Sequence, residues 1–204
     1  MKGHAMASQD SPGNTPTTVP PIKPHHSVIV SNSIPLTTRS GFEFHVRPVD
    51  PSDKEAFAEF FTHVSKEDLR FRFHSGMPSV KESLLDSLID VDHDRKEDYL
   101  AFDIDDKTII ASAMIGSKED KSEAEVAIVE RSDYKHRGMG WTFLEYVIEE
   151  ARRDGITKLT SLEHRTNHEA IKLEKEMGFM AKSCPEDATM VRLEFDLAAN
   201  SVEA

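Results

Sequence analysis

The sequence has a single cysteine, Cys184, which excludes an intramolecular disulfide and a zinc site built from cysteine pairs. It has no apolar run near the roughly 18 residues that a membrane-crossing helix needs, and its N-terminus lacks the apolar core of a signal peptide. Positive charge is also scarce: 25 Lys and Arg stand against 37 Asp and Glu, giving a net charge of −12. Since nucleic-acid binding needs clustered positive charge, we expect a cytoplasmic protein with no nucleic-acid partner and no membrane association.

Apolar residues are sparse in the first 38 residues, which are rich in Pro, Ser, Thr and Gly. Such a segment cannot bury enough surface to offset the entropy of ordering it. The chain as a whole is 38% hydrophobic, which is enough for one core. We therefore predict a disordered leader at 1–38, one folded domain at 39–198 and a disordered tail at 199–204.

Within this domain, strand and helix patterns alternate. Helix patterns place apolar residues at i, i+3, i+4 and i+7, as in 57–64, and strand patterns alternate strictly, as in 191–197. Strands are expected at 42–49, 99–104, 108–116, 124–130, 157–162, 179–184 and 189–197. Helices are expected at 50–65 and 79–91, from Gly140 to Gly155, and at 167–178.

The segment KHRGMG, residues 135–140, joins a predicted strand to a predicted helix. The first backbone N–H groups of a helix have no intrahelical partner, and together with the helix dipole they attract phosphate oxygens. The two glycines leave room for a phosphate to reach the backbone, and the three residues before them can add positive charge. A Rossmann fingerprint would need a third glycine where Phe143 stands, and a P-loop would need Gly-Lys-Ser/Thr, so neither fits.

KHRGMG follows AEVAIVE and precedes NHEAIKLEKEMGF, and this pairing resembles the signature of the GNAT superfamily of acyl-CoA-dependent N-acyltransferases. The first motif's positions are taken by Lys135, Gly138 and Gly140, and the second motif's by Asn167, Ala170, Leu173, Gly178 and Phe179. The resemblance implies an α/β (α+β) fold, with a mixed, mostly antiparallel, twisted sheet of about six to seven strands flanked by helices on both faces. It also implies acetyl-CoA as cosubstrate, entering where the strand ending at Glu130 splays from the one ending near Leu162.

A closer resemblance, over about residues 36–197, is to the acetyltransferase domain of Pat-type protein lysine acetyltransferases, which modify acetyl-CoA synthetase and related acyl-CoA ligases. Arg47-Pro48, RFRF at 70–73 and IDVD at 89–92 stand in the places of that family's motifs. This likeness implies acetylation of a protein lysine, with an acyl-CoA synthetase as a possible partner.

The resemblance also implies the site residues. The predicted catalytic base is Glu125, a carboxylate inside an apolar strand, with Glu123 as the alternative if a β-bulge shifts the faces. The residues predicted to bind acetyl-CoA are Ile128, Val129, Glu130, Lys135, His136, Arg137, Gly138, Met139, Gly140, Trp141 and Asn167. Glu130 departs from the small β-branched residue that the family prefers, and we expect its side chain to point to solvent. Glu174 stands where many members carry a tyrosine acid, which leaves the general acid unassigned.

Several alternatives remain open at this point. The acceptor could instead be a small amine such as a polyamine or an antibiotic, or the chain could be a non-catalytic acetyl-CoA sensor. Glu163, His164 and His168 suggest a metal, but Asn167 starts a helix between the histidines, so they need not share a face; we predict no metal site.

Overall fold

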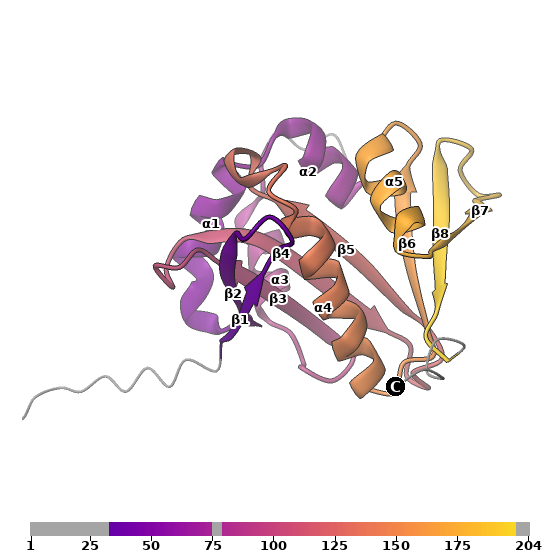
Figure 1. Cartoon of the computed structure of the whole chain (residues 1–204), viewed down its shortest axis with the longest axis horizontal. Coiled ribbons are helices and arrows are strands. Elements are labelled where there is room, and N and C mark those ends of the chain that lie inside the picture. Colours follow the sequence, from indigo (N-terminus) through magenta and orange to yellow (C-terminus); the bar gives the residue numbers. More distant parts are fainter. Residues whose placement is uncertain (1–32, 75–78, 199–204) are drawn as a thin grey trace, which may run out of the picture. The chain divides into compact units, whose positions relative to one another are not determined.

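The computed structural model describes residues 33–74 and 79–198, which form one eight-stranded sheet with helices on both faces (Figure 1). The spatial order of the strands is β1-β2-β3-β4-β5-β6-β8-β7. Every neighbouring pair is antiparallel except β5 and β6, which are parallel. The strands are β1 (Ile34–Thr37), β2 (Glu43–Pro48), β3 (Lys96–Phe102), β4 (Ile109–Ser117), β5 (Ala124–Glu130), β6 (Lys158–His164), β7 (Met180–Ser183) and β8 (Met190–Asp196).

The helices follow the apolar periodicity of the sequence. They are α1 (Lys54–Thr62), α2 (Lys66–Phe73), α3 (Glu82–Ile89), α4 (Met139–Arg153) and α5 (His168–Glu176), with short 3-10 turns η1 (Pro51–Asp53) and η2 (Ser132–Tyr134). The buried positions of α4 recur every three to four residues along its length, so one face of this helix packs on the sheet. The predicted α/β fold with a mixed sheet is confirmed, with one strand more than the six to seven expected.

Two hydrophobic cores lie on opposite faces of the sheet, because successive strand residues point to opposite sides. On β3, Tyr99 and Ala101 belong to the core beneath α4, whereas Leu100 and Phe102 belong to the core beneath α1 and α3. The second core is built around Phe57, whose ring centroid lies 4.8 Å from that of Phe61 in α1. The strands between these cores therefore have separate helical layers on their two faces.

Two elements differ from the sequence prediction. Strand β1 lies inside the segment predicted as a disordered leader, because it pairs antiparallel with β2 and packs Leu36 against the core; the predicted boundary at residue 38 is therefore too late. Helix α2 was not expected, because its charged sequence has almost no apolar periodicity, but Ser65 caps it by accepting a hydrogen bond from the Asp68 N–H (3.1 Å). The rest of the predicted leader, up to residue 32, and the predicted tail at 199–204 lie outside the described residues.

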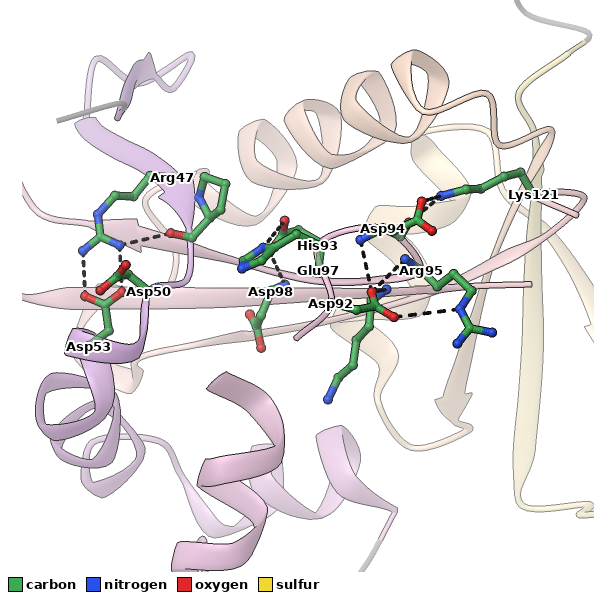
Figure 2. Close-up of polar contacts among 12 residues, drawn as sticks. Arg47, Asp50, Asp53, Asp92, His93, Asp94, Arg95, Glu97, Asp98 and Lys121 are labelled. Carbon is green, nitrogen blue, oxygen red and sulfur yellow. Dashed lines mark hydrogen bonds and ion pairs between the residues drawn. The ribbon is translucent and has the colours of Figure 1, made fainter. Parts of the chain in front are cut away.

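Two of the short motifs singled out in the sequence, Arg47-Pro48 and IDVD at 89–92, have structural roles (Figure 2). Arg47 makes a two-pronged ion pair with Asp53, at 2.7 and 2.6 Å, which fixes the end of β2 to the start of α1. Asp92, in the turn before β3, accepts hydrogen bonds through Oδ1 from the backbone N–H groups of residues 94, 95 and 96. These bonds hold the pKa of Asp92 at about 2. Both motifs thus stabilise connections on the side of the sheet that carries α1 to α3.

Candidate active site

The parallel strands β5 and β6 pair only at their first residues, Ala124 with Leu159 and Glu125 with Thr160, and then separate. A cavity of about 420 Å³ opens between them. Its walls come from α2, the second half of β5, the β5–α4 connection, the end of β6, and α5. The separation leaves residues 127–130 of β5 without a strand partner on the β6 side, so their backbone groups on that side can pair with a ligand.

The two glycines at the start of α4 form one wall of this cavity. Gly138 is the N-cap residue, with φ of 79°, in the left-handed region where glycine costs least. A Cβ added to Gly140 would overlap Oε1 of Glu130, so the only side-chain group that crowds this position is the movable end of Glu130, and glycine leaves the backbone itself uncovered. The unpaired N–H groups of the first helical turn can therefore be approached closely by a phosphate, as the pyrophosphate of acetyl-CoA would require.

The residues predicted to bind acetyl-CoA line the cavity, with one exception. The lining includes Ile128, Val129, Glu130, Lys135, His136, Gly138, Met139, Gly140, Trp141 and Asn167. Arg137 is not part of the lining, because its guanidinium lies over the rings of Tyr134 (4.5 Å) and Phe42 (5.0 Å). Lys135 is paired with Asp68 of α2 at 2.7 Å.

Glu130 lies at the cavity wall, beside Gly140. The expectation that this side chain points to solvent is wrong, since an even-numbered residue on β5 shares the face of Val126, beneath α4. Burial raises the pKa of Glu130 to about 7, which the positive charge of Lys135 only partly offsets. The carboxyl group therefore changes charge near neutral pH at the place where an anionic ligand would approach.

Two further carboxyl groups, Glu163 on β6 and Glu174 on α5, belong to the same cavity. Asn167 donates a hydrogen bond from Nδ2 to Glu163 at 2.7 Å, and Ser161 donates one to Glu174. Burial raises the pKa of Glu163 to about 7, and burial with the nearby Glu163 raises the pKa of Glu174 to about 8. The sequence motifs gave neither residue a titrating role, and the buried partner of Glu174 is a serine that no motif marks.

Glu125 lies on the other face of β5, the face of Val129 and the α1–α3 core. It is exposed, and its charge acts on Arg72 and His74, both of which line the cavity. Arg72 is a buried side chain whose Nε and Nη2 atoms have no hydrogen-bond partner among the described residues. Glu125 is not part of the lining itself, but it lies close to two residues of the cavity wall on the α2 side.

The alternative base, Glu123, has different surroundings. Its carboxylate contacts Lys158 (3.0 Å), Lys118 (3.3 Å) and Arg192 (3.7 Å), away from the cavity lining. The hydrogen bond from Lys158 is the main cause of a lowered pKa for Glu123. A carboxylate held by three cations is a weak proton acceptor, so this geometry favours Glu125 over Glu123.

Comparison with known proteins settles the family. A model of the Acetyltransferase (GNAT) family matches residues 58–179, more than half of the chain. The chain belongs to the GNAT acetyltransferase family. An acetyltransferase of Pseudomonas aeruginosa is 24% identical over 148 residues, which cover 72% of this chain and 80% of that protein.

Several solved structures of acyltransferases share the fold. The GNAT domain of S. lividans PAT has a TM-score of 0.74 at 24% identity, with 80% of this chain and 96% of that chain covered. A cAMP-binding acyltransferase from Mycobacterium smegmatis has a TM-score of 0.57 at 23% identity, covering 81% of this chain and 47% of that one. YncA, a putative acetyltransferase from Salmonella typhimurium solved with acetyl-CoA, has a TM-score of 0.61 at 16% identity, with 79% and 98% covered.

The chain is thus an acetyltransferase that moves an acetyl group from acetyl-CoA to an amine. The cavity fits this GNAT activity, since its wall joins the N-terminus of α4, residues 138–141, to titratable groups at the separated strands. The N-terminus of α4 is called the phosphate cradle below. Among the described residues, no group of three or more His, Cys, Asp or Glu side chains is placed to hold a metal ion. Over the same residues, no helix combines the length and the apolar character needed to cross a membrane.

Proposed function

We propose that this GNAT acetyltransferase acetylates the ε-amine of a lysine on a protein, with an acyl-CoA synthetase as one such partner. The observation that carries the proposal is that Glu125 is exposed to solvent and at the same time close to Arg72 and His74 of the cavity wall. A lysine presented by a large partner needs a base at an accessible mouth, whereas a small amine can be taken into an enclosed pocket. The likeness to Pat-type domains at Arg47-Pro48 and in the 70–73 and 89–92 segments supports the same acceptor.

In this proposal the donor lies along the wall formed by β5 and α4. Backbone N–H groups at 139–141 receive the pyrophosphate, with charge from Lys135 and His136. The backbone of 128–130, which lacks a strand partner toward β6, pairs with the pantetheine arm. Asn167 caps α5 through Oδ1 and lines the same channel. When bound, acetyl-CoA supplies a thioester carbonyl that an amine can attack.

Glu125 takes the proton that the acceptor nitrogen must lose, since an ammonium group has no free electron pair for attack. Its place on the α2 face of β5 separates it from the carboxyl groups beneath α5. A backbone N–H at the separated end of β5 stabilises the negative charge that develops on the carbonyl oxygen. Strand β5 thus supplies both the base and the hydrogen-bond donor for the carbonyl oxygen.

The acceptor is tested by incubating the chain with labelled acetyl-CoA, a panel of acyl-CoA synthetases, and polyamines and aminoglycosides. Label on a synthetase lysine, mapped by mass spectrometry, supports the proposal. Label on small amines alone rejects a protein acceptor. Tight acetyl-CoA binding without transfer to any acceptor would instead indicate a non-catalytic sensor.

The base is tested with Glu125→Gln. We expect kcat to fall roughly 100-fold, a typical contribution of a general base, while the acetyl-CoA Kd stays unchanged. Glu123→Gln is the matched control, because this residue lies two positions away and its carboxylate is held by Lys158, Lys118 and Arg192. An unchanged rate for Glu125→Gln across the whole pH profile would remove Glu125 from the mechanism.

A further inference from the structure

The end of the cavity beneath α5 contains two carboxyl groups with only neutral hydrogen-bond partners. Glu174 is 7% exposed and accepts a hydrogen bond from Ser161, and Glu163 accepts one from Asn167. Neither carboxyl group forms an ion pair with any part of the chain that the structure describes; the charge of Arg72 acts on Glu163 without a hydrogen bond. Two buried carboxyl groups that influence each other titrate as a pair and resist losing both protons.

Glu174 is the member of this pair that holds its proton most strongly. It is the more buried of the two, and the charge of Glu163 further disfavours its ionised form. A neutral carboxylic acid in a cavity wall can donate a hydrogen bond or a proton, which an ionised one cannot. The role left open in the proposed reaction is a proton donor for the leaving sulfur.

The acid and the base lie on opposite faces of the separated strands. On β6, Leu159 belongs to the core beneath α4, and Ser161 and Glu163 follow it on the same face. On β5, Glu125 points to the α1–α3 face instead. A proton can therefore be taken up on one side while another is given on the other side, without direct exchange between the two groups.

We propose that Glu174, buried in the cavity wall beside Glu163 and bonded to Ser161, is the general acid that protonates the departing thiolate. The proposal rests on the proposed function. The acceptor nitrogen forms a bond to the acetyl carbon and loses a proton to Glu125, and the carbon–sulfur bond breaks. Glu174 gives its carboxyl proton to the sulfur and becomes a carboxylate. Proton exchange with solvent then restores both groups, so no further reactant is needed.

The first test compares Glu174→Gln with Glu145→Gln, the latter removing an exposed carboxylate from α4 outside the cavity lining. We expect kcat to fall roughly 100-fold for Glu174→Gln and to stay unchanged for the control. The pKa of Glu174, about 8, sets the direction of the pH effect. The acid loses its proton above pH 8, so the wild-type kcat falls there, and Glu174→Gln lacks this alkaline limb.

A second measurement separates acid catalysis from a structural role. An acetyl aryl thioester releases a thiolate of low pKa that needs no protonation, so the wild type and Glu174→Gln should use it at similar rates. In the protein without acetyl-CoA, the infrared band of neutral carboxyl groups should contain a component that titrates near pH 8 in the wild type and is missing in Glu174→Gln, whereas the components of Glu130 and Glu163, which titrate near pH 7, remain. If Glu174→Gln is slowed relative to the wild type as much with the aryl thioester as with acetyl-CoA, the proposal is overturned.

Ser161→Ala provides a test that does not remove the carboxyl group. The hydrogen bond from Ser161 lowers the pKa of Glu174, so its loss should move the alkaline limb of kcat and the infrared titration to higher pH together. If the limb stays in place while the infrared titration moves, Glu174 is not the acid. If Glu125→Gln has a normal kcat while Glu174→Gln shows all the expected changes, the proposed base is wrong and the proposed acid stands. Failure of the base and failure of the acid therefore give different results.

Discussion

The two sides of the separated strands β5 and β6 use the same type of residue in different ways. Beneath α4 and α5, Glu130, Glu163 and Glu174 are largely removed from water, and burial raises the pKa of each. Toward α2, Glu125 is exposed beside His74. Side-chain alternation along a strand is enough to produce this contrast, since Glu125 and Glu130 differ by an odd number of positions.

The same division applies to stability. The α1–α3 side is held by a cluster of phenylalanine rings, and the α4 side contains the cavity and its buried titratable groups. Ionising a buried carboxyl group costs folding free energy, because its folded-state pKa lies above its unfolded value. Most of the stability lost in this way, as pH rises through about 7 to 8, should come from the α4–α5 side, which holds Glu130, Glu163 and Glu174. On the α1–α3 face of β3, burial likewise raises the pKa of Asp98 to about 7.

The strongest test of this division is Phe57→Ala. Phe57 is 0% exposed and stacks on Phe61, so its truncation leaves a cavity, and we expect the free energy of unfolding to fall by about 3–5 kcal/mol. Urea unfolding measures this loss. Because the cradle lies on the other face, the acetyl-CoA Kd of the folded variant should not change.

Ile104→Ala is the matched control, since this side chain is 67% exposed and its loss should change stability by less than about 0.5 kcal/mol. A rise of tenfold or more in the Kd of Phe57→Ala would show that the two sides are energetically coupled.

Gly140→Val tests the α4 side, where we expect a loss of acetyl-CoA affinity without a loss of stability. Among the atoms around Gly140, an added Cβ overlaps only the flexible end of Glu130, which can move, so the fold should tolerate the change. The new side chain nevertheless occupies the approach to the helix N-terminus. We expect the acetyl-CoA Kd to rise roughly 100-fold, about 2.7 kcal/mol, as measured by calorimetry.

The control for this variant is Gly116→Val in β4, where an added Cβ meets nothing within 4 Å and a β-branched residue suits a strand. Equal affinities for the two valine variants would contradict a phosphate cradle at Gly140.

Much of the fold could be predicted from the sequence, because apolar periodicity is a local signal. It indicated seven strands, α1, α3, α4 and α5, and the glycine pair at the start of α4. Strand β1 and helix α2 were not found, since β1 is stabilised by pairing with β2 rather than by its own pattern, and α2 by the Ser65 cap and Leu69.

The candidate site could be predicted in part. The motifs indicated ten of the lining residues, because glycines and caps at fixed spacing have a local cause. They gave no reason to place Glu130 beside Gly140 or Glu174 beside Ser161, because these contacts depend on how separate elements pack. A pKa depends on such packing, so the buried acids could be identified only in three dimensions.

The smallest expected effect, and the most specific to the α4 side, is that of Glu130→Gln. The pKa of Glu130 is about 7, so its carboxyl group is mainly neutral at pH 6 and ionised at pH 8. Beside the cradle, the ionised form opposes an incoming pyrophosphate, while Lys135 partly offsets the charge and Asp68 and Glu169 add to it. The wild-type Kd for acetyl-CoA should therefore rise relative to that of Glu130→Gln as pH increases through 7.

At pH 8 we expect Glu130→Gln to bind acetyl-CoA about tenfold more tightly than the wild type, about 1.4 kcal/mol, with little difference at pH 6. Glu55→Gln, which removes an exposed charge from α1, should match the wild type at both pH values. If the Kd of Glu130→Gln for acetyl-CoA has the same pH dependence as that of the wild type, the carboxyl group of Glu130 must move away from the helix N-terminus when acetyl-CoA binds. Glu125 and Glu130 would then differ in their positions on β5 but not in how their charge affects acetyl-CoA binding.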